Sequence, residues 1–151
     1  MKTPFVKMHG NGNDFVIIDN IKQNFRKNKT LIKKIADRRI GIGCDQLILI
    51  ENSKKYDAFM RIYNNDGSEA EMCGNAARCV ASLLMAGTKK TEVSLETISS
   101  TLKASLKNNN EICITMRVPE QDLKNIIKSD YQKIINLKEI SPLLTEGHVI
   151  N

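Results

Sequence analysis

A cysteine stands at the expected start of an apolar helix, in the run E-M-C-G-N-A-A-R-C at residues 71–79. The thiolate is the reactive form of cysteine, and the positive end of a helix dipole and unpaired backbone N–H groups both favour it. Gly74 has no Cβ that would obstruct a ligand, and Asn75 is expected to cap the helix. The run therefore predicts a reactive thiol at Cys73, with N–H donors directed at an anionic group.

The other cysteines and the N-terminal histidine are weaker candidates for catalysis than Cys73. Cys79 falls on an apolar face of the same helix, and Cys113 stands between two isoleucines in an expected strand, which predicts a place in the core. Cys44 has no obvious base nearby, so we expect all three to be structural. His9 begins a Gly/Asn loop, where a local hydrogen bond is a simpler role than catalysis. Cys73 has a structural alternative too, because free cysteines are often small buried apolar side chains.

Three neutral amides lie beside turns, and they extend the candidate site. A single Asn in a turn usually serves its own backbone. Together with residues 73–75, the side chains of Asn13, Gln46 and Asn64 predict a polar cage for a zwitterion, because amides bind both ammonium and carboxylate groups without adding charge. No zinc-type Cys/His spacing and no phosphate-loop or dinucleotide signature is present, so we expect no metal and no nucleotide.

The elements that must position these groups follow from hydrophobic periodicity. Strands are predicted at residues 5–8, 15–19, 46–50, 58–63, 92–97, 102–106 and 112–118, and a short helix at 31–36 with Thr30 as its cap. Gly41 and Gly43 are expected to stop that helix. A second helix, at 75–85, is apolar on nearly all sides and should be buried. Many strands and one buried helix predict an α+β fold, with a strongly curved, barrel-like sheet around a central helix.

Composition limits the classes of function. The chain has 151 residues, 41% hydrophobic and 26% charged, which suits one globular domain over residues 1–151. Few aromatic residues count against single-stranded nucleic acid as a partner. Eight of the basic residues behind the net charge of +6 lie between Lys22 and Arg39, where an apolar stripe favours a solvated helix face over a polyanion site. No run suits a signal peptide or a membrane span, so a cytoplasmic protein with free thiols is expected.

With these residues assembled, the sequence resembles the diaminopimelate epimerase family. K-M-H-G-N-G-N-D-F at residues 7–15 resembles the family's K-M-H-G-x-G-N-D-F, and R-R-I-G-I-G-C-D-Q at 38–46 resembles R-x-x-G-x-G-x-D-Q. R-I-Y-N-N-D-G-S at 61–68 resembles R-I-[FY]-N-x-D-G-S, and C-G-N-A-A-R-C at 73–79 resembles C-G-N-G-x-R-C. The four motifs occur in order and span roughly residues 5 to 85.

The resemblance implies a cofactor-independent isomerase that converts L,L-diaminopimelate into the meso form, for lysine and peptidoglycan synthesis. By position, Cys73 is one catalytic acid/base, and the family's substrate-binding positions correspond to Asn13, Gln46, Asn64, Gly74 and Asn75. One thiolate removes the α-proton while a second thiol, on the opposite face, delivers another. Backbone N–H groups at helix starts hold the α-carboxylate and stabilise the carbanion's charge.

Two departures from the family pattern stand out. Ala76 occupies the last glycine of the C-G-N-G run, a small change that we expect to be tolerated. The family is built from two pseudo-symmetric halves, and nothing after Cys79 resembles the second half with its own catalytic cysteine. We therefore expect an N-terminal half that is inactive or severely impaired alone. The full-length family implies a homodimer, and a separate C-terminal half is a candidate partner.

Two other functions stay open at this point. One is a related isomerase with the same two-half fold, such as a proline-type racemase or a phenazine-biosynthesis-like isomerase. The other is a non-catalytic binding module that kept the amide cage. The loops around Asn13, Gln46 and Asn64 favour diaminopimelate.

Overall fold

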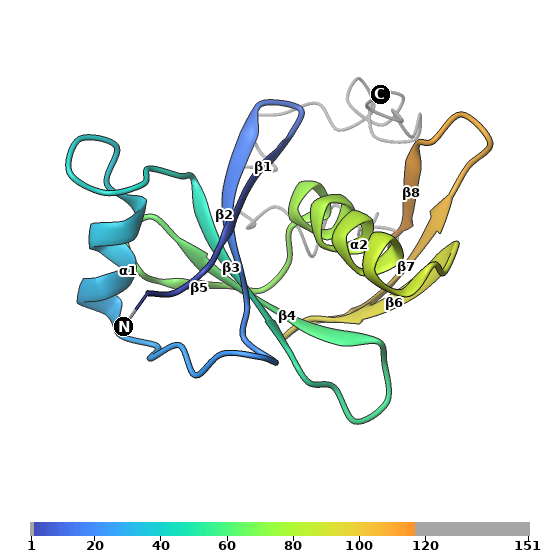
Figure 1. The fold of residues 1–151 in the computed structure, drawn as a ribbon, viewed down its shortest axis with the longest axis horizontal. Coiled ribbons are helices and arrows are strands. Elements are labelled where there is room, and N and C mark those ends of the chain that lie inside the picture. The colour runs from blue at the N-terminus through green and yellow to red at the C-terminus, as the bar shows by residue number, and fades with distance from the viewer. Residues whose placement is uncertain (1, 117–151) are drawn as a thin grey trace, which may run out of the picture. The chain divides into compact units, whose positions relative to one another are not determined.

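The computed structural model describes residues 2–116, which form one curved sheet and two helices (Figure 1). The elements are β1 (Val6–Gly10), β2 (Asn13–Asp19), α1 (Lys29–Ala36), β3 (Gln46–Glu51), β4 (Ala58–Asn64), β5 (Glu69–Ala70), α2 (Gly74–Thr88), β6 (Glu92–Glu96), β7 (Thr101–Leu106) and β8 (Ile112–Thr115). Every predicted strand and both predicted helices are present, whereas the two-residue β5 was not predicted. Residues 117–118 of the last predicted strand lie outside the described residues, and the single domain over 1–151 stays a prediction.

The order of strands across the sheet is β1-β2-β3-β4-β6-β7-β8, with β5 paired to β4. All pairs are antiparallel except β2–β3 and β4–β6, and each parallel pair is connected through a helix. Because β4 runs antiparallel to β3, two crossovers of the same hand must place their helices on opposite faces of the sheet. The side-chain clusters agree, since α1 and α2 pack against different faces.

Strict alternation along the central strands explains their nearly continuous apolar sequences. In β3, Ile48 and Ile50 pack with α2, while Leu47 and Leu49 pack with α1. All four are buried, as predicted for a strand covered on both faces. Within residues 2–116, α2 covers one face of β6–β8, and the other face carries polar residues such as Ser94, Lys103 and Thr115.

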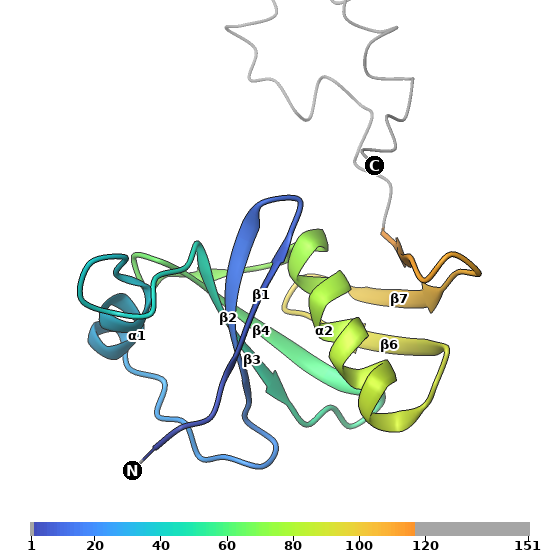
Figure 2. The same cartoon turned by 45° about the horizontal axis from the view of Figure 1, so that its top comes forward.

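The sheet curls around α2, as the sequence predicted. The helix contacts β1 and β8, which are the two edge strands of the sheet, and also β2, β6 and β7 between them. Figures 1 and 2 show α2 lying inside this curve, with α1 on the outer side. Six of its side chains are buried, namely Ala76, Ala77, Cys79, Val80, Ala81 and Met85. A helix that is apolar nearly all round suits this enclosed position.

Both predicted helix caps were wrong, for the same physical reason. The side chain of Asn28, not Thr30, accepts hydrogen bonds from the first N–H groups of α1. Likewise Cys73, not Asn75, is the N-cap of α2, and it has the extended backbone (φ −150°, ψ 112°) that an N-cap residue adopts. The chain turns into each helix earlier than the apolar pattern indicates. The α1 helix also ends at Ala36, before either of the predicted stop glycines.

The β1–β2 hairpin brings the start of β2 close to α2. Asn11 and Gly12 have φ values of 53° and 84°, which a two-residue type I′ turn requires at both positions. Gly10 permits the contact with α2, because a Cβ on Gly10 would lie 3.2 Å from the carbonyl oxygen of Asn75. None of the helices in residues 2–116 has the length and apolar character needed to cross a membrane.

Candidate active site

The three predicted amide residues lie at one end of the sheet. Asn13 begins β2, Gln46 begins the parallel strand β3, and Asn64 ends the antiparallel strand β4. Gln46 is directly opposite Asn64 in the β3–β4 ladder. The register therefore gathers these side chains at the end of the sheet where α2 begins, because Gly10 at the hairpin approaches Asn75.

Cys73 is half-buried and has one hydrogen-bond donor and one acceptor close to its sulfur. The backbone N–H of Ala76 donates to Sγ across 3.5 Å. The Sγ of Cys73 donates to Oδ1 of Asn13, at 3.7 Å. Two of the predicted site residues thus touch directly, and the thiol lies at the N-terminus of α2.

The first turn of α2 presents N–H groups beside this thiol. The first four N–H groups of a helix have no partner within the helix. Those of Ala76 and Ala77 are bound by the sulfur and the carbonyl oxygen of Cys73. The N–H groups of Gly74 and Asn75 precede them in the turn and lack an acceptor among residues 2–116. Such a turn is a favourable place for a carboxylate.

The amides of Gln46 and Asn64 form a second part of the site. Nε2 of Gln46 donates to Oδ1 of Asn64 at 3.0 Å, and Nδ2 of Asn64 donates to Oγ of Ser68 at 3.1 Å. Oδ1 of Asp66 in turn accepts a hydrogen bond from Ser68. Oε1 of Gln46 is buried and has no hydrogen-bond partner within the described part of the chain. A buried amide oxygen without a donor is costly, so this atom is suited to accept a hydrogen bond from a ligand.

An ion-pair network fixes the Asn13 end of the site, and sequence reasoning missed it. Oδ2 of Asp45 accepts hydrogen bonds from Nδ2 of Asn13 at 2.9 Å and from the N–H of Asp14 at 3.1 Å. Arg38 binds both carboxylates, at 2.7 Å to Asp14 and 2.8 Å to Asp45. The Arg38 guanidinium holds the pKa of the Asp14 carboxyl well below its usual range, and the hydrogen bond from the Asn13 amide lowers the pKa of Asp45. The sequence did contain a sign of this network, because Asp14 and Asp45 are each adjacent to a predicted amide residue.

The other cysteines are structural or exposed. Cys79 is buried as predicted, and Cys44, for which only a structural role was predicted, is buried too; burial raises the pKa of both thiols. Cys113 is exposed, so its predicted place in the core was wrong. Its neighbours Ile112 and Ile114 turn inward and pack with α2, and strand alternation therefore turns Cys113 outward. Within residues 2–116, no three His, Cys, Asp or Glu side chains are grouped to hold a metal ion.

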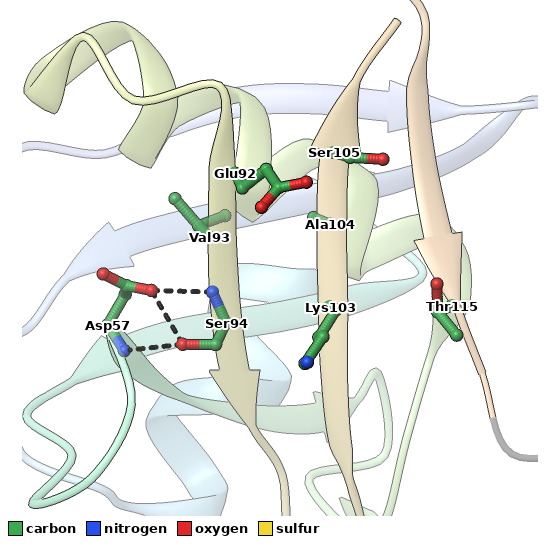
Figure 3. A pocket seen from close by; sticks show the side chains of 8 residues that line it. All are labelled: Asp57, Glu92, Val93, Ser94, Lys103, Ala104, Ser105 and Thr115. Atoms are coloured by element: carbon green, nitrogen blue, oxygen red, sulfur yellow. Dashed lines mark hydrogen bonds between the residues drawn. The ribbon is translucent and has the colours of Figure 1, made fainter.

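A separate pocket of about 310 Å³ lies on the polar outer face of β6–β8 (Figure 3). Asp57 binds there to the N–H and hydroxyl of Ser94, both at 2.7 Å, and to Lys90. These bonds hold the pKa of Asp57 down at about 2. The pocket is lined by none of the predicted site residues and by no cysteine, so the candidate active site is the one around Cys73.

The fold is that of the epimerase and isomerase structures it matches. A hydroxyproline epimerase from Agrobacterium vitis superimposes with a TM-score of 0.55 at 16% identity, over 74% of this chain and 40% of that chain. A phenazine biosynthesis protein of the PhzF family from Bacillus anthracis gives a TM-score of 0.54 at 23% identity, over 76% and 40%. Identities this low establish the shared fold and not a shared reaction.

The sequence comparison places the chain in one family within this fold. The model of the diaminopimelate epimerase family matches residues 5–121. The diaminopimelate epimerase of Carboxydothermus hydrogenoformans is 48% identical over 120 residues, which is 76% of this chain and 44% of that protein. The chain therefore belongs to the diaminopimelate epimerase family. It spans less than half the length of the curated relatives it matches.

Proposed function

We propose that this chain is the N-terminal half of a cofactor-independent epimerase that converts L,L-diaminopimelate into the meso form, in the synthesis of lysine and peptidoglycan. Membership of the family supports this assignment. The observation that carries it is the position of Cys73, whose sulfur caps α2 beside two N–H groups and contacts the Asn13 amide. A carboxylate on those N–H groups places the adjacent α-carbon next to the thiol.

The proposed step is proton transfer between this sulfur and the α-carbon. As a thiolate, Cys73 takes the α-proton: the C–H bond breaks, an S–H bond forms, and the electron pair stays on the substrate, delocalised into the carboxylate. The N–H groups of Gly74 and Asn75 stabilise the charge that develops on the carboxylate oxygens. In the reverse direction the Cys73 thiol returns a proton from the same face.

The side-chain amides of Gln46 and Asn64 are proposed to bind the end of the substrate that is remote from the reacting α-carbon. Diaminopimelate carries a second ammonium group, and the unpartnered Oε1 of Gln46 can accept a hydrogen bond from it. Asn64 is bound to Gln46 and so fixes the orientation of that amide. Uncharged amides suit this role because they bind a zwitterion without adding a charge near the thiol.

Inversion needs a second acid on the opposite face of the α-carbon, and we propose that a C-terminal half supplies it. Among the described residues, the nearest cysteine in sequence is Cys79, which is only 4% exposed and packs in the core beside β-strand residues. A thiol in that position cannot reach a ligand at the helix start. The chain alone is therefore expected to exchange the α-hydrogen at most, and not to invert the centre.

Hydrogen exchange in D2O tests the proposal. The reduced chain is incubated with L,L-diaminopimelate, and the α-proton signal is followed by NMR, with Cys73→Ala as the control. Loss of the α-proton signal in the wild type alone is the expected result. Equal exchange in both proteins would exclude Cys73 as the base. Binding measured by calorimetry without exchange in either protein would favour a non-catalytic binding module, and binding by Gln46→Leu as tight as the wild type would refute the role of the amide.

A further inference from the structure

We propose that Asp45 is a positioning residue that fixes the amide of Asn13, so that the Cys73 sulfur is held between one hydrogen-bond acceptor and one donor. The functional meaning of this arrangement rests on the proposed role of Cys73 as acid and base. The arrangement itself is a property of the free chain. It is testable without substrate.

The orientation of the Asn13 amide follows from the chemistry of Asp45. An ionised carboxylate only accepts hydrogen bonds, so the group of Asn13 that lies 2.9 Å from Oδ2 of Asp45 must be the NH₂ donor. The amide oxygen then lies on the other side, 3.7 Å from Sγ of Cys73. An amide oxygen only accepts, so at this contact Cys73 must donate its S–H proton.

The two contacts of the sulfur favour opposite protonation states. The Asn13 oxygen favours the thiol, whereas the Ala76 N–H, 3.5 Å from Sγ, favours the thiolate. A group that both removes and returns a proton must be accessible in both forms. If the Asn13 amide turned over, its NH₂ group would face the sulfur, and both neighbours would then stabilise the thiolate.

Asp45 is itself held rigidly. Its own N–H donates to Oδ1 of Asp14 at 2.9 Å, while the N–H of Asp14 donates back to Oδ2 of Asp45. This reciprocal pair joins the starts of β2 and β3. Arg38 bridges both carboxylates, and Lys7 forms a second ion pair with Asp14. The pKa of Asp45 lies below its usual value, so the group remains an ionised acceptor at neutral pH.

The test is the rate at which iodoacetamide alkylates Cys73 in the reduced 151-residue chain at pH 7, resolved for each cysteine by mass spectrometry. In Asp45→Ala the Asn13 amide is free to turn its NH₂ group toward the sulfur. The alkylation rate should then rise about fivefold, the factor given by one exchanged hydrogen bond of ordinary strength. In Asp45→Asn the new amide oxygen still accepts from Asn13, so the rate should stay within about twofold of the wild type.

This pair of variants separates orientation from charge. An equal rise in both would show that the lost negative charge matters and would overturn the proposal, as would an unchanged rate in Asp45→Ala. Asp57→Ala is the matched control, because that carboxylate has similar bonds to Ser94 and Lys90 but lines the pocket of Figure 3, which contains no residue of the candidate active site. Its rate should equal that of the wild type.

Folding is monitored in the same samples. The buried Cys44 remains unmodified while a variant is folded, and the exposed Cys113 gives an internal reference rate. Should Asp45→Ala not fold, Asn13→Ala removes the acceptor at the sulfur without supplying a donor, so the rate should rise by less than in Asp45→Ala; an unchanged rate there also refutes the proposal. Because the assay contains no substrate, its outcome is independent of the proposed epimerase activity.

Discussion

Replacing Cys73 should reveal that its side chain stabilises α2, apart from the catalytic role proposed for it. Sγ accepts a hydrogen bond from the Ala76 N–H at 3.5 Å, so the residue satisfies one of the otherwise unpaired donors of the first turn. Serine is among the strongest N-cap residues and alanine among the weakest, a difference of about 1 kcal/mol. Both variants lack the sulfur, so comparing them isolates the cap.

For a folded unit of this size, about 1 kcal/mol changes the melting temperature by about 4 °C. We expect Cys73→Ser to melt about 4 °C above Cys73→Ala, at or above the temperature of the wild type. The measurement is thermal unfolding of the reduced proteins at pH 7, followed by far-UV circular dichroism.

Asn75→Ala is the matched control. If Asn75 were the cap, as its residue type suggests, this change would cost about 1 kcal/mol. The side chain of Asn75 instead accepts a hydrogen bond from Arg78, one turn along the helix, and losing such a pair costs about 0.5 kcal/mol or less. Equal melting temperatures for Cys73→Ser and Cys73→Ala, together with a larger loss in Asn75→Ala, would refute the assignment of the cap.

Four further predictions concern other parts of the chain. The pKa of Asp14 is lowered from its usual 3.8, so the ionised carboxylate stabilises the fold above pH 3.8, and this stabilisation is lost as the pH falls below that value. In urea titrations below about pH 4, the free energy of unfolding should therefore fall less steeply with pH in Asp14→Asn than in the wild type. In similar titrations at pH 7, Gly87→Ala should raise the free energy of unfolding by about 0.5–1 kcal/mol, because it lies in a helix with open space around its Cβ position. Gly43→Ala should lower it by about 1–2 kcal/mol, because its φ is +77°. A thiol reagent should modify Cys113 in the native chain at once, but Cys44 only on unfolding; rapid modification of Cys44 would contradict its burial.

The parts of the fold that depend on apolar periodicity could be predicted from the sequence. The apolar run from Leu47 to Ile50 is too short for a helix, so it predicts a buried strand. The helix at residues 75–85 is apolar on nearly all sides, which predicts that the sheet curves around it. The helix caps could not be predicted in this way. A cap depends on where the backbone turns, and the propensity of Asn75 gave no information on that.

The candidate site shows the same division. Its amides are recognisable from residue type and neighbouring turns, but the bond between Asn13 and Asp45 joins residues 32 positions apart and depends on the parallel register of β2 and β3. The error at Cys113 was avoidable, because a residue between two inward isoleucines must point outward in any strand.

The order of strands in the sheet also has a consequence for how the chain folds as it is synthesised. Each strand from β2 to β4 pairs with the strand made just before it, and β6 to β8 continue in the same direction. The sheet can therefore grow at one edge, in step with the ribosome, without any strand having to insert between two that are already paired. The α2 helix emerges after β5 and before β6, so the apolar surface that the last three strands cover already exists when they are made.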